Sequence, residues 1–313
     1  MKVFVAGHNG LVGSSLIRNT PFHHETIIAN RKDLDLSDEK AVTVFFEKHE
    51  PDAVVLAAAK VGGIFANSQN QKDFLVENLK IQNSVILSAV KIGIPNLIFL
   101  GSSCIYPKYA HQPIREDSLL TGFLEPTNEG YALAKIVGIK LCNSISDELG
   151  LNYFSLMPTN IYGPNDNFDL QNGHVVAALM RKFHQAKQLS KSTVEIWGSG
   201  TPRREFMFVE DLASAIWFML ETKSPGELIN VGTGKDVEIR ELAEIMSEIV
   251  GYEGNIIYDK TKPDGTPRKL LDVTKIHTYG WRHQMELRDG LNITYEWFKE
   301  NLETGRSEEH TSE

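Results

Sequence analysis

The chain has 313 residues, of which 42% are hydrophobic and 23% are charged, and its formal net charge is −9. This composition is ordinary for a globular protein with a sizeable core, and it indicates one large or two modest domains. The negative charge argues against general nucleic-acid binding, so an anionic ligand would need a local basic pocket.

The two cysteines, Cys104 and Cys142, provide neither a disulfide framework nor the spacing of a zinc site. We therefore expect no metal ion, and the cysteine content fits a reducing compartment. Met1-Lys2 leads directly into an apolar run without a signal peptide, and no later stretch of about 20 apolar residues predicts a membrane span. These features predict a cytoplasmic protein without membrane contact.

The C-terminal segment 306–313 is polar throughout and has no apolar periodicity. It also resembles the in-frame translation of a common sequencing-library adapter. Our hypothesis is that this segment is a non-native or disordered tail, and we exclude it from the predicted fold.

The first predicted element is a buried strand over Lys2–Ala6, which leads into a glycine-rich turn and a helix over Ser14–Asn19. Spaced glycines permit a tight turn, let the backbone approach a pyrophosphate, and allow the helix to pack closely on the strand. The start of the helix adds unpaired N–H groups and a favourable dipole. This pattern predicts a dinucleotide site made by Gly7, Gly10, Leu11, Val12 and Gly13.

The second predicted strand, Thr26–Ala29, determines which dinucleotide is expected. A 2′-phosphate needs cations near the end of this strand, and Arg31 and Lys32 follow it directly. The pattern therefore favours NADPH. NADH use stays open, because the glycine turn carries Asn9 and the strand ends in alanine.

Helices and strands then alternate, which indicates an α/β fold with a doubly wound, Rossmann-type parallel sheet. Ligands of such sheets bind at the carboxyl ends of the strands, where Gly7, residues 57–63 and residues 102–104 are expected to lie. The predicted elements are helix 38–49, strand 53–59, helix 72–93, strand 97–100, helix 129–149 and strand 153–156.

Beyond Pro164 the alternation loosens. We expect an NADP-binding domain over 1–164, which 203–222 rejoins through a strand at 206–209, and a mainly substrate-binding domain over 165–305. The elements predicted here are a loop over 165–173, helices 174–188, 210–220, 239–250 and 286–301, and strands 194–197, 228–231 and 255–258, the last two in the smaller part.

Tyr131 and Lys135 lie four residues apart on the predicted helix 129–149, so both side chains project from one face. A lysine ammonium beside a phenol favours the phenolate and lowers the pKa of the tyrosine, which makes it usable in proton transfer near neutral pH. Such a pair often occurs by chance. Ser102, after the preceding strand, and the glycine turn supply the other parts that a reductase needs.

Ser102, Tyr131, Lys135 and the glycine turn together resemble the short-chain dehydrogenase/reductase superfamily, in its extended form that acts on nucleotide sugars. Longer strings resemble the GDP-L-fucose synthase family, and the resemblance runs from Val3 to about Phe298. It implies NADPH-dependent 3,5-epimerisation and 4-reduction of GDP-4-keto-6-deoxy-D-mannose to GDP-L-fucose by a homodimer. The strings are residues 57–63, 101–107, 125–129, 157–160, 197–202 and 262–269.

The resemblance also implies a role for each site residue. The C4 carbonyl acidifies the hydrogens on both neighbouring carbons, so each epimerisation needs only a base on one face and an acid on the other. By the resemblance, Cys104 is the base and His174 the acid. Tyr131 and Ser102 stabilise the enolate; Tyr131 then protonates O4, while Lys135 tunes the tyrosine and holds the nicotinamide ribose. Further cofactor contacts fall on Leu100, Ser102, Lys135, Pro158, Asn160, Ile161 and His174, and GDP contacts on Lys182, Trp197, Arg204, Asp264 and Lys269.

Simpler structural roles remain open for several of these residues. Cys104 could be a small buried hydrophobe, His174 a helix cap, Trp197 a core residue and Lys182 a solvated helix residue. Cys142, in the middle of its helix, is expected to be structural. For the whole chain, the alternatives are another nucleotide-sugar reductase, epimerase or dehydratase, or a catalytically silent dinucleotide sensor on the same fold. The intact catalytic set argues against the sensor.

Overall fold

The computed structural model describes residues 1–170, 173–223, 226–262 and 264–302, and the tail at 306–313 lies outside these ranges. Its largest element is a six-stranded sheet in the order β2-β1-β3-β4-β5-β9, with all neighbours parallel. The predicted α/β sheet is therefore confirmed. Its strands are β1 (Lys2–Ala6), β2 (Glu25–Ile27), β3 (Ala53–Leu56), β4 (Asn96–Leu100), β5 (Asn152–Pro158) and β9 (Leu228–Val231).

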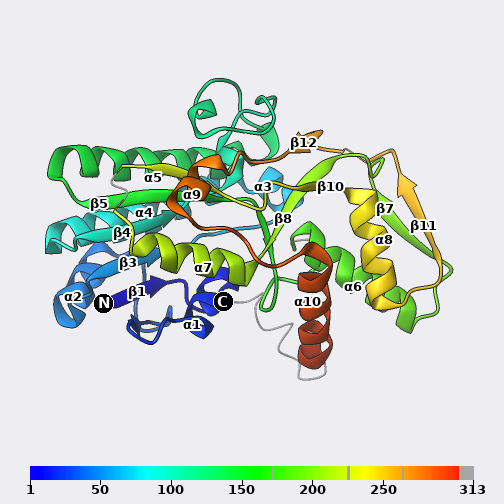
Figure 1. Cartoon of the computed structure of the whole chain (residues 1–313), viewed down its shortest axis with the longest axis horizontal. Helices are drawn as coiled ribbons and strands as arrows, with labels where there is room; N and C mark the ends of the chain where they lie inside the picture. The colour runs from blue at the N-terminus through cyan, green and yellow to red at the C-terminus, as the bar shows by residue number, and fades with distance from the viewer. Residues whose placement is uncertain (171–172, 224–225, 263, 303–313) are drawn as a thin grey trace.

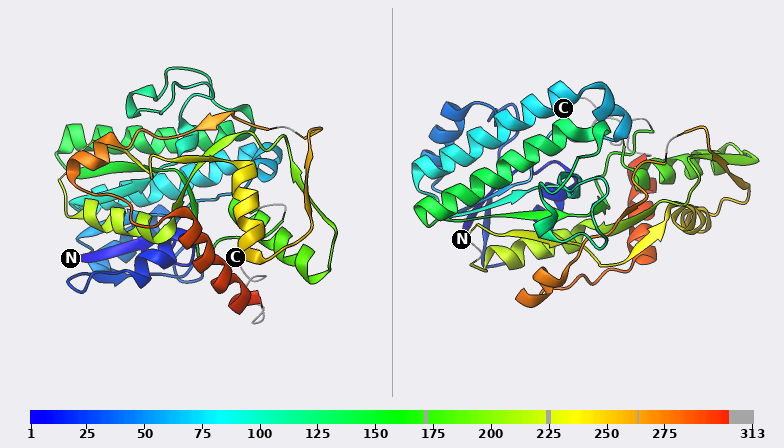
Figure 2. Two further views of the ribbon diagram at one scale, coloured as in Figure 1. Left: turned by 45° about the vertical axis from the view of Figure 1, so that its right-hand side comes forward. Right: turned by 90° about the horizontal axis from the view of Figure 1, so that it is seen from above.

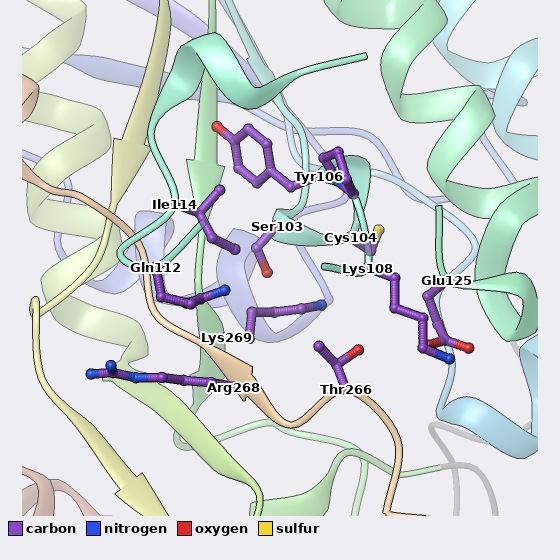
Figure 3. A pocket seen from close by; sticks show the side chains of 11 residues that line it. Ser103, Cys104, Tyr106, Lys108, Gln112, Ile114, Glu125, Thr266, Arg268 and Lys269 are labelled. Atoms are coloured by element: carbon purple, nitrogen blue, oxygen red, sulfur yellow. The ribbon is translucent and has the colours of Figure 1, made fainter. Parts of the chain in front are cut away.

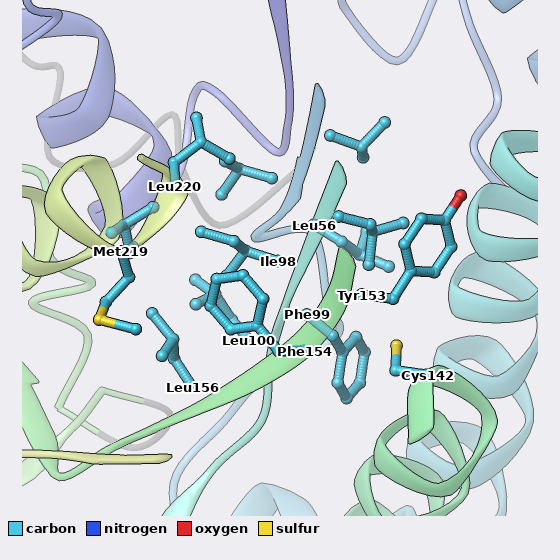
Figure 4. Packing of buried hydrophobic residues seen from close by; sticks show 14 of the residues in the cluster. Leu56, Ile98, Phe99, Leu100, Cys142, Tyr153, Phe154, Leu156, Met219 and Leu220 are labelled. Carbon is cyan, nitrogen blue, oxygen red and sulfur yellow. The ribbon is translucent and has the colours of Figure 1, made fainter. Parts of the chain in front are cut away.

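Helices cover both faces of this sheet (Figures 1 and 2). On one face α2 (Glu39–His49), α4 (Gln71–Ile92) and α5 (Glu129–Leu149) pack side by side, and on the other α1 (Leu11–Arg18) packs against α7 (Val209–Leu220). The strands between them are buried on both sides, so they read as continuous apolar runs. Figure 4 shows the resulting core, in which Leu56, Phe99 and Phe154 are fully buried.

A second hydrophobic cluster is packed among α6, α8, α10 and short strands, on the right of Figure 1. There β8 pairs with β6, β10 and β12, and β7 pairs with β11. The helices are α6 (Val175–Gln188), α8 (Ile239–Val250) and α10 (Leu287–Leu302); the strands are β6 (Asn160–Tyr162), β7 (Thr193–Trp197), β8 (Arg203–Phe208), β10 (Asp236–Glu238), β11 (Asn255–Asp259) and β12 (Arg268–Lys269).

Two strand assignments from the sequence are wrong. Residues 206–209 were expected to rejoin the large sheet, but β8 belongs to the smaller one, although α7 directly after it does pack on the large sheet. The strand at 228–231, expected in the smaller part, is β9 and pairs with β5. A short apolar strand reads the same in either sheet, because periodicity does not specify its partner.

Other boundaries differ by a few residues. Helix α1 begins at Leu11 rather than Ser14, and β3 ends at Leu56 rather than at residue 59. The sequence did not predict α3 (Ile64–Gln69), α9 (Thr274–Tyr279) or the 3₁₀ turns η1 (Ser103–Ile105), η2 (Glu116–Ser118) and η3 (Pro126–Asn128). In the part of the chain that is described, no helix combines the length and apolar character needed to cross a bilayer.

Candidate active site

The glycine turn between β1 and α1 has the geometry of a phosphate cradle. Gly7 has φ +86°, which favours glycine, and the N–H of Gly10 donates to the Gly7 carbonyl at 3.1 Å. A Cβ atom at Gly13 would lie 2.0 Å from that carbonyl oxygen, so a side chain there has no room. The first N–H groups of α1, from Leu11 onward, have no acceptor within the helix. These residues fit the pyrophosphate of a dinucleotide.

The turn that follows β2 lies beside this cradle. The side-chain amide of Asn9 donates to Asn30 at 3.4 Å, which brings the two turns together. Arg31 and Lys32 come next and are exposed. Two cations beside the glycine turn are the arrangement that a ribose 2′-phosphate requires.

The predicted catalytic group forms where the carboxyl end of β4 meets the first turns of α5. Lys135 is almost fully buried; its ammonium donates to the Leu100 carbonyl at 2.8 Å and lies 5.7 Å from the centre of the Tyr131 ring. Directly after β4, the Ser102 hydroxyl accepts the backbone N–H of Cys104 at 3.4 Å and so caps η1. Four side chains from two distant segments therefore share one buried site.

The charge balance of this group differs from the sequence expectation. Burial raises the pKa of Tyr131, a negative charge on Cys104 raises it further, and hydrogen bonding by Ser102 only partly opposes them. The prediction of a lowered tyrosine pKa is therefore wrong, because burial disfavours the charged phenolate more than the Ser102 hydrogen bond favours it. Burial also lowers the pKa of Lys135, to about 8.

Cys104 is buried beside two lysines. Burial raises the pKa of its thiol, while Lys269, a hydrogen bond with Ser102, and Lys135 act to lower it. Cys104 and Lys269 line one pocket, which residues 103–114 enclose from one side and residues 266–269 from the other (Figure 3). Burial has the larger effect, so the pKa of the thiol is raised on balance, but the two lysines give a thiolate at this position cationic neighbours.

The pocket contains polar residues that the sequence did not single out. Lys108 and Glu125 form an ion pair at 2.9 Å on its wall (Figure 3). Gln112 accepts the backbone N–H of Leu270 at 2.9 Å and ties the loop to the end of β12. Glu125 lies in one of the family-like strings, but no sequence spacing points to the ion pair, because the pair forms only when two loops meet.

His174 precedes α6 and is held by an aspartate that the sequence did not single out. Its Nδ1 lies 3.5 Å from a carboxylate oxygen of Asp166, which is buried, and this partner raises the pKa of His174 against the opposing effect of burial. The side chain makes no cap to the helix that follows. An imidazole beside a buried carboxylate is suited to hold a proton, as a general acid must.

The predicted GDP contacts form one group on β8 and β12 and a second group at the end of β7, and Asp264 connects the two. Arg204 on β8 and Lys269 on β12 are cross-strand neighbours, and burial lowers the pKa of both. Trp197, at the end of β7, is 59% exposed, so the core alternative is wrong. Asp264 links the groups: it precedes β12, yet its carboxylate accepts the Ser199 N–H at 2.6 Å, just past β7.

Lys182 also lies beside β7. Its ammonium donates to the Glu195 carbonyl at 2.5 Å, and burial lowers its pKa. It is therefore partly desolvated and held by the backbone, which disfavours the alternative of a fully solvated helix lysine.

The remaining predicted cofactor residues follow the carboxyl ends of neighbouring strands. Leu100 ends β4 and holds Lys135, and Pro158 ends β5. Asn160 and Ile161 lie in β6 immediately afterwards, where the Asn160 amide donates to the Glu205 carbonyl at 2.9 Å. These positions lie at the edge of the sheet where a ligand is expected.

A fully buried carboxylate, Glu205, organises the backbone behind Arg204. One of its oxygens accepts the N–H groups of Thr233 and Gly234 at 2.6 and 2.7 Å, and the other accepts that of Leu271 at 2.9 Å. Burial raises the pKa of Glu205, and these three hydrogen bonds oppose the shift. The side chain thus joins β8 to the segments after β9 and β12.

Asn230, in the middle of β9, has a similar role behind the pocket. Its side-chain oxygen accepts the Tyr106 hydroxyl at 2.6 Å, and its amide donates to the carbonyls of Ile114 at 2.9 Å and Asp272 at 3.2 Å. An amide inside an apolar strand is a readable sequence signal, because buried polar groups need partners.

Residues 3–232 match the NAD dependent epimerase/dehydratase family. The chain belongs to this family. Relatives in it include GDP-L-fucose synthase 1 of Arabidopsis thaliana, 52% identical over 96% of this chain and 94% of its own length, and GDP-L-fucose synthase of Escherichia coli, 49% identical over 97% and 98%. Among solved structures, a GDP-mannoheptose C4 reductase from Campylobacter jejuni with NADP bound has a TM-score of 0.87 and 36% identity over 95% of this chain and 98% of its own.

Proposed function

We propose that this member of the epimerase/dehydratase family is a GDP-L-fucose synthase. Its substrate would be GDP-4-keto-6-deoxy-D-mannose, inverted at C3 and C5 and reduced at C4 to GDP-L-fucose. The observation that carries the proposal is the position of Cys104: a thiol near two lysines lies together with the reductase residues Ser102, Tyr131 and Lys135. The relatives at about half identity over nearly the whole chain support the same reaction.

NADPH is the proposed cofactor, and a relative that carries NADP supports this choice. The glycine turn and the start of α1 would hold the pyrophosphate, and Arg31 would hold the 2′-phosphate. Lys135 would contact the nicotinamide ribose. When bound, the cofactor supplies the hydride that reduces a ketone. Comparing kcat/KM for NADPH and NADH tests the choice; a preference for NADH would refute it.

For the epimerisations, the Cys104 thiolate would remove the proton on C3 or C5, and the electron pair would move onto O4 to give an enolate. The hydroxyls of Ser102 and Tyr131 would stabilise that negative charge. His174, protonated beside Asp166, would then deliver a proton to the opposite face of the same carbon. Both residues regain their starting protonation by exchange with water before the second inversion.

For the reduction, Tyr131 would donate its phenolic proton to O4 as C4 becomes an alcohol carbon. The raised pKa of Tyr131 keeps the phenol protonated, the form a proton donor needs. The two chemistries then share one residue: Tyr131 stabilises the enolate oxygen first and protonates the alkoxide oxygen afterwards.

The GDP part of the substrate would bind along the second group of elements. Arg204 and Lys269 would face the diphosphate as cations, and Trp197 offers an exposed ring beside them. Lys182 and Asp264 would complete the contacts, the latter by holding the loop after β7.

We further propose that the protein is a cytoplasmic homodimer. Both cysteines are free and buried, as a reducing compartment allows. On α4 and α5 the side chains of Val76, Leu87, Leu133 and Val137 are exposed by 40–45%, and such apolar positions on neighbouring helices favour self-association. Light scattering after size exclusion tests the dimer, and a monomer at micromolar concentration would refute it.

The decisive experiment is turnover of GDP-4-keto-6-deoxy-mannose with NADPH in deuterated water. A GDP-L-fucose synthase yields GDP-L-fucose carrying deuterium at C3 and C5, because both positions exchange their protons with solvent. A simple C4 reductase would yield the uninverted 6-deoxy sugar without deuterium there. No NADPH oxidation by the folded protein would refute both readings.

A further inference from the structure

Three side chains that the proposed reaction does not use converge near the amino ends of the strands. His23 and His24 lie in the connection between α1 and β2, and Glu221 follows the last turn of α7. The Nε2 atoms of His23 and His24 lie 2.6 and 3.1 Å from the same carboxylate oxygen of Glu221. The ligand atoms of all three residues are within 4.8 Å of one another.

We propose that His23, His24 and Glu221 bind a divalent transition-metal ion of the Zn²⁺ class. Two imidazole nitrogens and one carboxylate oxygen are a ligand set that Zn²⁺ uses in proteins, with bonds of about 2.0–2.2 Å. Ligand atoms around such a tetrahedral ion are roughly 3.3 Å apart. The observed separations need only small side-chain rotations to reach this geometry, and two of the three residues, His23 and Glu221, are exposed.

The surroundings of His24 hold its ring in place. Its Nδ1 lies 3.3 Å from the N-terminal ammonium of Met1, so Nε2 must give up its proton and the ammonium must turn away when a metal ion binds. The His24 side chain is 2% exposed, and its ring stacks on Trp217 of α7 at 5.3 Å between centroids and 21° between planes. Trp217 in turn donates its indole N–H to the Leu16 carbonyl of α1 at 3.3 Å. His24 is therefore fixed by packing, while His23 and Glu221 approach it from the surface of the protein.

The location assigns this site a structural role rather than a part in the reaction. His24 directly precedes β2, and Glu221 precedes β9; parallel strands all begin at one edge of the sheet. The catalytic residues follow the carboxyl ends at the opposite edge. A bound ion would join α7 to the connection between α1 and β2, and it would stabilise the folded chain by mass action.

The test is Zn²⁺ titration of the full chain, purified without a polyhistidine tag and treated with a chelator. We expect one Zn²⁺ bound per chain and a rise in Tm with Zn²⁺ concentration, whereas Mg²⁺, which prefers oxygen ligands, should give neither. His23→Ala and Glu221→Gln should each weaken Zn²⁺ binding roughly tenfold or more. The double variant should show no Zn²⁺-dependent rise in Tm.

His111→Ala, which removes an exposed histidine elsewhere, is the matched control and should bind Zn²⁺ like the parent chain. Cu²⁺ gives a second readout, because the paramagnetic ion close to Trp217 should quench its fluorescence, and Trp217→Phe should lose that component. Equal Zn²⁺ affinity in His23→Ala, Glu221→Gln and the parent chain would overturn the proposal, as would an absence of binding. Since the variants lie away from the catalytic residues, unchanged turnover of the sugar nucleotide would leave the proposed function untouched.

Discussion

The two cysteines of this chain are both buried in the same α/β unit, yet their surroundings differ. Cys142 lies inside α5 against β5, among apolar side chains (Figure 4), and burial raises its pKa to about 12. Burial raises the pKa of Cys104 as well, but Lys269, a hydrogen bond with Ser102, and Lys135 each oppose that shift. Burial alone makes a thiol inert. What distinguishes Cys104 is that cations are buried with it, so a thiolate there would have partners.

The largest effect is expected from removing the thiol that has these partners. Cys104→Ser should reduce deuterium incorporation at C3 and C5 by about 10²–10⁴-fold, because a hydroxyl is a far weaker base. Binding of NADPH should be retained, which fluorescence titration can measure. Unchanged deuterium exchange at C3 and C5 would show that Cys104 is not the base. The two cysteines would then not differ in function.

Next in size is the loss of the Tyr131 hydroxyl. Tyr131→Phe should lower the rate of NADPH oxidation about 10²–10³-fold, since the developing charge on O4 loses one donor. Some exchange at C3 and C5 should survive through Ser102. Mass spectrometry of the recovered substrate measures exchange separately from reduction. Equal loss of both would contradict the expectation that Tyr131 matters more for reduction than for exchange.

A smaller effect is expected when one cation near Cys104 is removed. The base is the thiolate, so exchange rises as the pH passes upward through the pKa of Cys104. Lys269 lowers that pKa, so Lys269→Met should raise it and move the rising limb of the exchange profile to higher pH. Lys108→Met is the control, because Lys108 lines the same pocket but is paired with Glu125. An unmoved limb in Lys269→Met would show that Lys269 does not tune the thiol.

The smallest effect on activity is expected at the other cysteine. Cys142→Ala should leave kcat and the pH profile unchanged and lower the free energy of unfolding by about 1–2 kcal/mol, since it leaves a small cavity in the core. Urea denaturation measures the loss. A large fall in turnover at full folding would mean that the two cysteines are not as different as their surroundings indicate.

Much of this contrast was readable from the sequence. The alternation of strands and helices predicted the large parallel sheet. The glycine turn and Ser102 follow predicted strands, so they predicted a site at the carboxyl edge of that sheet. The sheet to which β8 and β9 belong was not readable, since a buried strand carries no mark of its partner. The direction of the Tyr131 pKa was also wrong, because spacing reveals the nearby cation but not the depth of burial.

The Lys108–Glu125 ion pair and the Asp166 partner of His174 were missed for another reason. Each joins residues in loops whose paths depend on the whole fold. Asn230 is different: a polar residue within an apolar strand is visible in the sequence, and it marks where the backbone needs extra hydrogen bonds. Glu205 follows two arginines, so the sequence does not mark it in this way.

The hydrogen bonds of Asn230 limit how the substrate specificity of this pocket can be changed. Its one side chain forms hydrogen bonds with residues 106 and 114, which line the Cys104 pocket, and with residue 272, which follows the lining segment 266–269. The shape of the pocket therefore depends on contacts between segments that are far apart in the sequence. A segment transplanted from a relative would have to supply a hydroxyl at position 106 and place the backbone carbonyl of residue 114 or 272 within reach of Asn230.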